Sequence, residues 1–286
     1  HPGYGFLSEN AKFAEIVEEH GLTFIGPSPE HIRMMGDKVE AKKAMRAVKV
    51  PCVPGTEDAV TDVEAAKAIA EEIGYPVLIK AAGGGGGKGM KVANASSELA
   101  DMMALAKREA LANFGNDAVY MEKYLSHPRH IELQILADTH GNVVHLGERD
   151  CSLQRRHQKV LEEAPSPALN AKERKRLGDI GCAAIKQLGY RNAGTLEFLY
   201  QDGEFYFIEM NTRLQVEHPI TEAISDIDIV REMIRIASGA PLSFRQDDVK
   251  FMGHAIECRI NAENPSTFKP SPGTVTDYHA PGGLGV

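Results

Sequence analysis

Residues 204–219, EFYFIEMNTRLQVEHP, decide the fold of this chain because they join a buried strand to a row of polar side chains. Residues 204–208 are mostly aromatic or β-branched, which is typical of a largely buried strand. Successive side chains of an extended chain point to opposite faces, so polar residues at every second position share one face. These are Glu209, Asn211, Arg213, Gln215 and Glu217.

This polar row is where we place the chemistry. Burying two carboxylates, two amides and a guanidinium side by side is costly unless a metal, a substrate or the groups themselves satisfy one another. The alternative is a solvated edge strand. Such edges usually carry lysine, so the composition of the row favours a functional site.

A second unusual segment is the glycine run at residues 82–89, AGGGGGKG. Glycine lets backbone N–H groups approach and cradle an anion. The run does not match a Walker motif. Residues 84–89 match a dinucleotide fingerprint, but a strand is expected next, where that fold requires a helix. Flanked by Lys80 and Lys88, the run predicts a flexible phosphate flap between two strands, with a plain flexible linker as the alternative.

The relation between Glu197 and Glu209 depends on the turn at Asp202-Gly203. A strict two-residue hairpin would pair residue 201 with 204 and put the carboxylates on opposite faces. A three-residue loop, or a bulge at Gly203, would bring them together. Two facing carboxylates need a cation, and hard oxygen ligands beside ATP phosphates suit Mg²⁺ or Mn²⁺, with Asn211 nearby. Turn chemistry alone leaves both registers open.

The periodicity along the chain predicts an α/β (α+β) protein without internal repeats or low-complexity linkers. Asp37 is a possible N-cap of the second expected helix. The expected helices cover residues 8–19, 38–48, 62–73, 96–113, 171–188 and 220–238, and the expected strands cover 22–25, 77–80, 90–93, 119–123, 131–137, 143–148, 194–200, 204–211 and 255–261.

The composition excludes several classes of function. A net charge of -8 argues against a nucleic-acid surface, although the basic cluster at residues 155–159 suggests a small anionic ligand. The 4 cysteines form no CxxC pair, so neither a zinc site nor a disulfide framework is predicted. No apolar run approaches the ~20 residues that cross a bilayer. We expect a cytoplasmic protein; because the chain begins at His1 without methionine, it reads as clipped, and a mitochondrial location stays open.

The chain contains the motifs EMNTRLQVEHPITE, GGGGGKGM, MEKYL, RDCSLQRRHQK and HAIECRINAE. These five motifs resemble those of the biotin carboxylase branch of the ATP-grasp enzymes, and the resemblance runs from His1 to Val286. It implies an ATP-grasp fold with a partial N-terminal α/β domain and linker helices at residues 1–50, a small mobile lid with the glycine-rich loop at 51–124, and a central antiparallel-sheet catalytic domain at 125–286. Parts of the family's N-terminal domain and C-terminal portion are then missing.

The resemblance also implies roles for single residues. Glu217 would be the base that deprotonates bicarbonate, Lys159 would hold phosphate, and Arg259 would stabilise the biotin anion. Read alone, Lys38 would be a solvated lysine, Glu122 would merely end a strand, and His130 would be a structural histidine. The implied metal ligands are Glu197, Glu209 and Asn211; the implied bicarbonate ligands are Arg213, Gln215 and Val216; and the implied nucleotide contacts are Lys38, Lys80, Gly85, Gly86, Gly87, Glu122, Lys123, Leu125, His130 and His157.

The implied reaction is ATP-dependent carboxylation of biotin by bicarbonate, through carboxyphosphate. No Ala-Met-Lys-Met sequence is present, so biotin would be carried on a biotin carboxyl carrier protein, with carboxyltransferase subunits as further partners. We expect a homodimer at full length and favour acetyl-CoA carboxylase of fatty-acid synthesis over propionyl-CoA, methylcrotonyl-CoA or pyruvate carboxylases. Two alternatives are another ATP-grasp ligase, against which the polar row and RRHQK argue, and a catalytically dead ATP-binding fragment.

Overall fold

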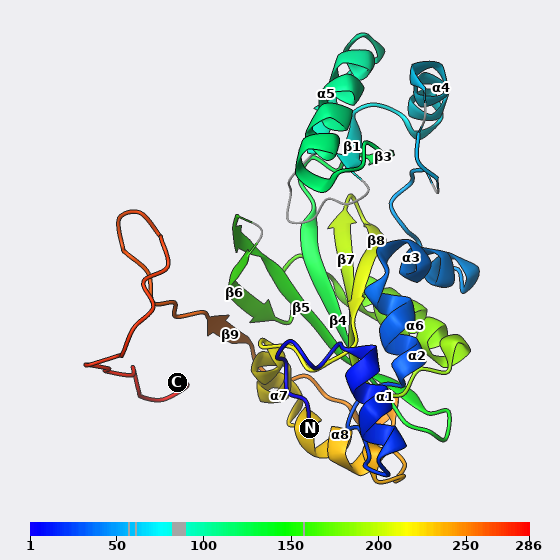
Figure 1. Cartoon of the computed structure of the whole chain (residues 1–286). Helices are drawn as coiled ribbons and strands as arrows, with labels where there is room; N and C mark the ends of the chain where they lie inside the picture. Colours follow the sequence, from blue (N-terminus) through cyan, green and yellow to red (C-terminus); the bar gives the residue numbers. More distant parts are fainter. Residues whose placement is uncertain (57, 61, 82–89, 157) are drawn as a thin grey trace.

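The protein was analysed as a computed structural model that describes residues 1–56, 58–60, 62–81, 90–156 and 158–286. The described strands form a three-stranded sheet in the order β2-β1-β3 and a six-stranded sheet in the order β8-β7-β4-β5-β6-β9. Every strand pair in both sheets is antiparallel. Figure 1 shows the small sheet at one end of the molecule, above the large one, with helices packed against both.

Three helices precede the unit of the small sheet: α1 (Ala11–Glu19), α2 (Pro29–Gly36) and α3 (Lys38–Ala47). The Asp37 side chain accepts hydrogen bonds from the N–H groups of Val39 and Glu40, as predicted for the N-cap of α3. Sequence reasoning missed α2, although Ser28 and Pro29 are a typical helix start. The predicted strand at residues 22–25 is wrong, because in the described part of the chain this segment has no strand to pair with.

The small sheet is covered by two helices and has its own hydrophobic core. Buried residues from these helices and strands, among them Leu99 and Met121, form a cluster separate from the core of the large sheet. The unit comprises α4 (Val63–Ile73), β1 (Val77–Ala81), β2 (Met90–Ala93), α5 (Ser96–Phe114) and β3 (Val119–Lys123). The predicted phosphate flap at residues 82–89 lies outside the described residues, and the proposed lid boundary at residues 51–124 stays a prediction.

The large sheet is packed on both faces. Leu177 and Ile185 of α6 (Ala171–Leu188) join a core with Leu133 and Leu196, and a Cβ on Gly181 would collide with the Leu133 side chain. On the other face, α8 (Ile229–Ala237) contributes to a second core. The strands are β4 (Arg129–Ala137), β5 (Val143–Arg155), β6 (Gln158–Ala164), β7 (Asn192–Gln201), β8 (Glu204–Asn211) and β9 (Ala255–Cys258).

Two differences from the sequence prediction lie in this sheet and its helices. Strand β6 was missed, because the basic cluster at residues 155–159 masks the β5–β6 hairpin. The single helix predicted at residues 220–238 is two helices, α7 (His218–Ser225) and α8. Asp226 ends α7 in a left-handed conformation with φ 57°, and the side chain of Asp228 caps α8.

The remaining described chain includes a short 3₁₀ helix, η1 (Gln246–Asp248), before β9. From Arg259 onwards the chain leaves the edge of the large sheet and extends away from it (Figure 1). No helix in the described ranges is long and apolar enough to cross a membrane. The six-stranded sheet is therefore the scaffold on which the polar residues must be placed.

Candidate active site

A bulge within β8 brings Glu197 and Glu209 opposite each other. The turn at Asp202-Gly203 is a strict two-residue hairpin, with φ 53° and 82°, and pairs Gln201 with Glu204. Further along, the register shifts by one residue, because Phe198 pairs with Phe207 whereas Glu197 pairs with Glu209. The extra residue is Ile208. Of the arrangements that the turn chemistry left open, the structure has the strict hairpin at the turn and a bulge within β8, and the two glutamates face each other.

Glu197 is buried and accepts several hydrogen bonds. Its Oε1 accepts from Asn211 Nδ2 at 2.6 Å, Gln215 Nε2 at 2.9 Å and Lys159 Nζ at 3.1 Å. Its Oε2 lies 2.8 Å from His130 Nε2. Burial raises the pKa of Glu197, but His130 and Lys159 more than offset this and lower it to about 2. The structure thus brings four of the predicted site residues around this carboxylate.

Glu209, in contrast, is partly open to solvent. Its side chain is 37% exposed and its Oε2 lies 3.0 Å from Lys38 Nζ. Facing carboxylates fit a hard divalent cation, and the exposed oxygens of Glu209 leave room for one. Asn211 fits less directly, because its amide oxygen accepts a hydrogen bond from Arg213 Nη2 at 2.8 Å. The two glutamates therefore fit Mg²⁺ or Mn²⁺, and Asn211 would have to exchange its partner first.

Lys159 is the centre of the buried cluster. Its Nζ donates to Glu132, to Glu197 at 3.1 Å and to Glu217 at 2.8 Å. Burial lowers the pKa of Lys159, but the charges of these carboxylates raise it well above its ordinary value. His130, Glu132 and Glu197 have donor atoms close enough to share a metal ion. In this arrangement the Lys159 ammonium already supplies the positive charge to both glutamates of that group.

Arg149 holds several polar side chains of the cluster through hydrogen bonds. Neither Arg149 nor Glu132 was predicted as a site residue from the sequence. The Arg149 side chain is fully buried, and its Nη2 donates to Gln215 Oε1 at 2.6 Å and lies 3.4 Å from Glu132 Oε2. It also donates to Gln134, Thr195 and Thr221. A usable signal was the alternation of polar and apolar residues from His130 to Gln134, which repeats the pattern of residues 209–217.

Beyond Asn211 the polar row leaves the sheet. Strand β8 ends at Asn211 and the chain bends through residues 212–217 into α7, so the polar face expected for an extended chain ends at Asn211. The bend has a cause outside the segment: Glu9 accepts from Thr212 N–H at 3.0 Å and from Arg213 Nε at 2.8 Å. Glu217 therefore returns to the cluster, instead of continuing along the strand.

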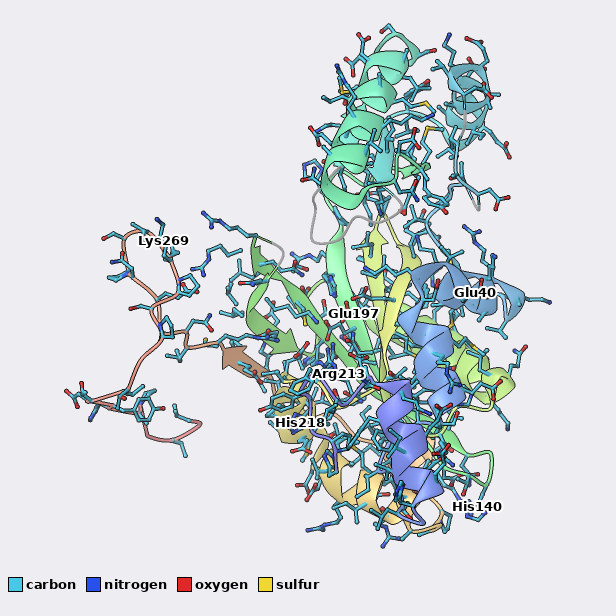
Figure 2. The ribbon with its side chains drawn as sticks, in the orientation of Figure 1. Glu40, His140, Glu197, Arg213, His218 and Lys269 are labelled. Carbon is cyan, nitrogen blue, oxygen red and sulfur yellow. The ribbon has the colours of Figure 1, made fainter. Side chains whose placement is uncertain are left out.

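Glu217 is held between two cations. Its Oε1 accepts from Lys159 at 2.8 Å, and its Oε2 accepts from Arg259 Nη2 at 2.9 Å. Its backbone occupies the N-cap position of α7, directly after Val216 in the turn. In Figure 2, Glu197 and Arg213 lie at the middle of the molecule, far from Lys269 on the C-terminal extension. Hydrogen bonds thus join the predicted catalytic residues Lys159, Glu217 and Arg259 in one cluster, to which Arg213 is linked through Asn211.

Lys38 and His130 lie beside the glutamates of the large sheet, whereas the other predicted nucleotide contacts among the described residues form a second group in and near the small sheet. Glu122 Oε1 accepts from Lys80 at 2.8 Å and from Lys42 at 3.1 Å. The Lys123 ammonium donates to the carbonyl oxygens of Gly74 and Tyr75, at 2.8 and 3.2 Å. Leu125 is half-buried directly after β3. Gly85, Gly86, Gly87 and His157 lie outside the described residues.

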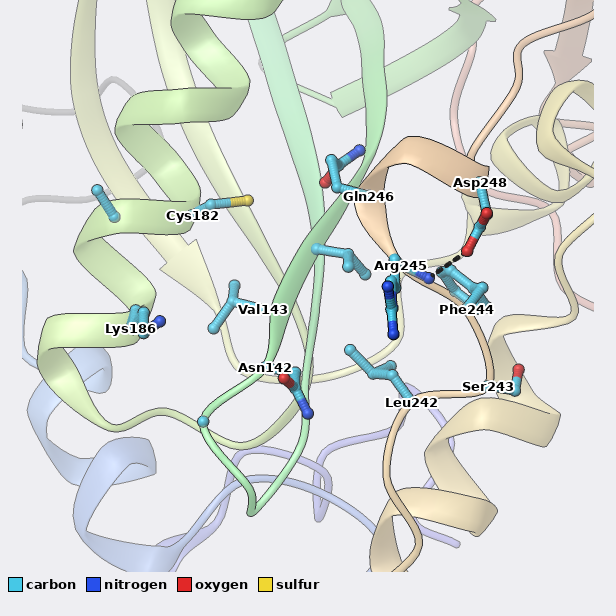
Figure 3. Close-up of a pocket in the computed structure, with 13 residues that line it drawn as sticks. Asn142, Val143, Cys182, Lys186, Leu242, Ser243, Phe244, Arg245, Gln246 and Asp248 are labelled. Carbon is cyan, nitrogen blue, oxygen red and sulfur yellow. Dashed lines mark hydrogen bonds between the residues drawn. The ribbon is translucent and has the colours of Figure 1, made fainter.

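A cavity of about 620 Å³ lies elsewhere, between α6 and residues 242–248 (Figure 3). Its lining includes Val143, Cys182, Lys186 and Arg245, none of which was predicted as a site residue. It holds no member of the carboxylate cluster. The candidate active site is therefore defined by the polar cluster around Lys159.

Comparisons with known proteins find relatives over the whole length of this chain. Residues 37–245 match the family described as the carbamoyl-phosphate synthase L chain, ATP binding domain, and residues 1–32 match the biotin carboxylase N-terminal domain. A biotin carboxylase of Allochromatium vinosum is 61% identical over 287 aligned positions, and the match covers 100% of this chain and 64% of that protein. One of the pyruvate carboxylase subunits of Methanothermobacter thermautotrophicus is 54% identical, over 100% of this chain and 58% of that protein.

A solved structure is similar throughout the chain. The biotin carboxylase domain dimer of Hydrogenobacter thermophilus 2-oxoglutarate carboxylase, in complex with MgADP, ADP and bicarbonate, has a TM-score of 0.86 and 52% identity. The match covers 99% of this chain and 63% of that one. The present chain thus spans less than two thirds of the length of each of these relatives.

Proposed function

Because this chain belongs to the biotin carboxylase family of ATP-grasp proteins, we propose that it carboxylates biotin with bicarbonate at the expense of ATP. The observation that carries this proposal is the position of Glu217 between Lys159 and Arg259. A carboxylate flanked by two cations can accept a proton from a small anion that those cations also attract. The bicarbonate in the Hydrogenobacter relative supports the same class of substrate.

In the proposed reaction, bicarbonate attacks the γ-phosphoryl group of ATP, ADP leaves and carboxyphosphate forms. Carboxyphosphate then breaks down to CO2 and phosphate beside the biotin ureido ring, whose N1 gives up its proton to phosphate and bonds to CO2. Phosphoryl transfer requires positioning and charge neutralisation from the protein. Lys38, Lys80 and Lys159 would hold phosphate oxygens. Mg²⁺ or Mn²⁺, held by Glu197 and Glu209 with Asn211, would neutralise charge on the phosphates.

Glu217 would act as the base toward bicarbonate. Both of its oxygens are bonded in the described structure, so one of them must exchange its bond to Lys159 or Arg259 for the substrate hydroxyl. Arg213 and Gln215, with the Val216 N–H, would bind the bicarbonate oxygens. Arg213 is suited to this task because Glu9 and Asn211 fix its guanidinium in place.

Arg259 would stabilise the enolate-like oxygen of the biotin anion once Glu217 has released it. The nucleotide would lie between the small sheet and the large one. Its adenine ring would contact Glu122, Lys123 and Leu125, and its ribose would lie near His130. Gly85, Gly86, Gly87 and His157 complete the proposed nucleotide contacts. These assignments rest on the family and await site-directed tests.

The proposed partners are a biotin carboxyl carrier protein and carboxyltransferase subunits, with a homodimer at full length. The Hydrogenobacter domain is a dimer in its structure, which supports the last point for the family. The final acceptor stays open, because the relatives include pyruvate and 2-oxoglutarate carboxylases beside freestanding biotin carboxylases. Acetyl-CoA carboxylase of fatty-acid synthesis, in the cytoplasm, is the setting that we propose first.

The direct test is phosphate release from ATP by the full-length protein, with and without bicarbonate and free biotin. We expect release that requires bicarbonate and rises with biotin. Release that requires ammonia, or another acceptor in place of bicarbonate, would instead indicate a different ATP-grasp ligase. ATP binding without any release would indicate a catalytically dead member of the family.

A further inference from the structure

Two glutamates face each other on the last two strands of the large sheet, beyond the residues assigned to the reaction. Glu162 of β6 is directly opposite Glu257 of β9 in the antiparallel register. Side chains at directly opposite positions project from the same face, with Cβ atoms about 4.5–5.5 Å apart. Glu162 is fully buried and Glu257 is half-buried.

Each of these glutamates has a buried oxygen without a partner. Oε1 of Glu162 accepts from Arg259 Nε at 2.6 Å. Oε2 of Glu162 and Oε2 of Glu257 are both buried and have no hydrogen-bond partner among the described residues. Leaving two carboxylate oxygens buried and unpaired is costly. One proton held between the facing carboxyl groups would satisfy both oxygens at once.

The charges around the pair favour that proton. Burial, together with the charges of Glu162 and Glu217, raises the pKa of Glu257 to about 7, although the charges of Arg259 and Arg149 oppose this rise. Burial likewise raises the pKa of Glu162, although Arg259 and the more distant Lys159 lower it. The net effect on both pKa values is upward. The cations Arg149 of β5, Lys159 of β6 and Arg259 after β9 do not offset burial and the mutual repulsion of the three carboxylates.

The pair is joined to the proposed active site by a single guanidinium. Arg259 N–H donates to Val160 O at 3.1 Å, which continues the pairing of β9 with β6. Because residues 257 and 259 are two positions apart in this extended segment, their side chains lie on the same face. The guanidinium then bridges Glu162 through Nε and Glu217 through Nη2, the latter at 2.9 Å. A change of charge at Glu162 and Glu257 therefore acts directly on the cation that contacts Glu217.

We propose that Glu162 and Glu257 form a carboxyl–carboxylate pair that shares one proton and positions Arg259 against Glu217. With the proton in place, the pair carries one negative charge, and Arg259 is shared evenly between Glu162 and Glu217. When the proton is lost, a second negative charge draws Arg259 toward the pair and away from Glu217. The role in turnover rests on the proposed function, whereas the shared proton does not.

The proton itself is tested without any assay of activity. In the full-length protein at about pH 6, infrared difference spectra of wild type against Glu257→Gln should show a carboxylic-acid carbonyl band that the variant lacks. Glu162→Gln should lack the same band. Glu163→Gln is the matched control, because Glu163 is the neighbouring residue of β6 and binds His254 at 3.0 Å. Glu163→Gln should keep the band, and its absence from the wild-type spectrum would overturn the proposal.

The pH dependence of stability gives a second readout. At pH values between the ordinary Glu pKa of 4.5 and the Glu257 pKa of about 7, the folded state holds a proton that the unfolded state has lost. The stability that this proton contributes is therefore present at low pH and is lost as the pH rises through about 7. The melting temperature of wild type should therefore fall more between about pH 6 and about pH 8 than that of Glu257→Gln. Equal falls in the two proteins would count against a shared proton.

Turnover then tests the positioning of Arg259. The bicarbonate-dependent rate of wild type should decline above about pH 7, and Glu257→Gln should remove that decline. Glu162→Gln should lower the rate about 10-fold to 100-fold, because a misplaced guanidinium no longer meets its partner. A pH profile in Glu257→Gln identical to that of wild type would overturn the positioning role. Absent turnover in wild type, with the infrared band present, would instead overturn the proposed function and leave the shared proton standing.

Discussion

The small sheet and the large sheet distribute their charges in opposite ways. In the small sheet one carboxylate, Glu122, is shared by two lysines, Lys80 of the same sheet and Lys42 of the neighbouring helix α3. In the large sheet one lysine, Lys159, is shared by three carboxylates. The two lysines around Glu122 carry more positive charge than this carboxylate neutralises, so they can also bind phosphates. The cluster around Lys159 needs further positive charge, which a divalent cation, a guanidinium or a proton can supply.

Burial makes the difference between the two regions larger. Lys80 is 35% exposed, so water screens its interaction with Glu122. The side chains of Glu132 and Arg149 are fully buried, so each depends on its partners for solvation. The small sheet can therefore release its lysines to a ligand at little cost, whereas the large sheet keeps its groups in fixed positions. Four substitutions test this comparison.

The largest effect is expected from Glu217→Gln in the full-length protein. The variant keeps the shape of the side chain but removes the base, so bicarbonate-dependent turnover should fall by about 10² to 10⁴, or about 3–5 kcal/mol of barrier. ATP binding, measured by calorimetry, should be nearly unchanged. Near-full carboxylation with a loss of ATP affinity would place the base elsewhere.

Arg149→Met tests whether the large sheet depends on its buried charges. The variant leaves Glu132 and Gln215 without their shared donor, so the free energy of unfolding should fall by about 3–5 kcal/mol, as measured with urea. Arg231→Met is the control, because Arg231 is an exposed partner of Asp228 on α8. A loss for Arg149→Met no larger than that of the control would show that the buried network contributes little to stability.

Lys80→Met addresses the small sheet. Since Lys80 is half-exposed, the free energy of unfolding should change by less than about 1 kcal/mol, while ATP affinity should fall roughly tenfold through the loss of one phosphate contact. Lys67→Met is matched to it, as Lys67 pairs with Glu64 on the surface of the same unit. Equal ATP affinity in both variants would remove Lys80 from the proposed nucleotide site.

The smallest effect is expected from Glu9→Gln, which weakens the contact that bends residues 212–217. The amide still accepts one hydrogen bond from Thr212 or Arg213 but loses the ion pair, at a cost of about 1 kcal/mol. The KM for bicarbonate should rise about fivefold with kcat nearly constant. Glu18→Gln, which breaks the surface pair with Arg191, is the control. An unchanged KM for bicarbonate would mean that Arg213 does not need Glu9.

Local sequence signals predicted the elements that depend on local chemistry. The helix at α6 was predicted at residues 171–188 and is confirmed, and Asn170 and Glu173 close its capping box. The strand at β3 was likewise predicted with its observed bounds. The missed elements depend on distant partners. Strand β6 is defined by its pairing with β5 and β9, and its basic turn gave no strand signal.

The chain's own pattern placed the chemistry in residues 209–217 and, with the family resemblance, assigned most residues of the cluster around Lys159. What only the tertiary structure decided is how those residues meet. The bulge at Ile208 makes Glu197 face Glu209 despite a strict hairpin, and the contact with Glu9 turns the chain so that Glu217 reaches Lys159. Both depend on residues far apart along the chain. Alternation determines which side chains share a face, but pairing register and long-range hydrogen bonds determine which faces meet.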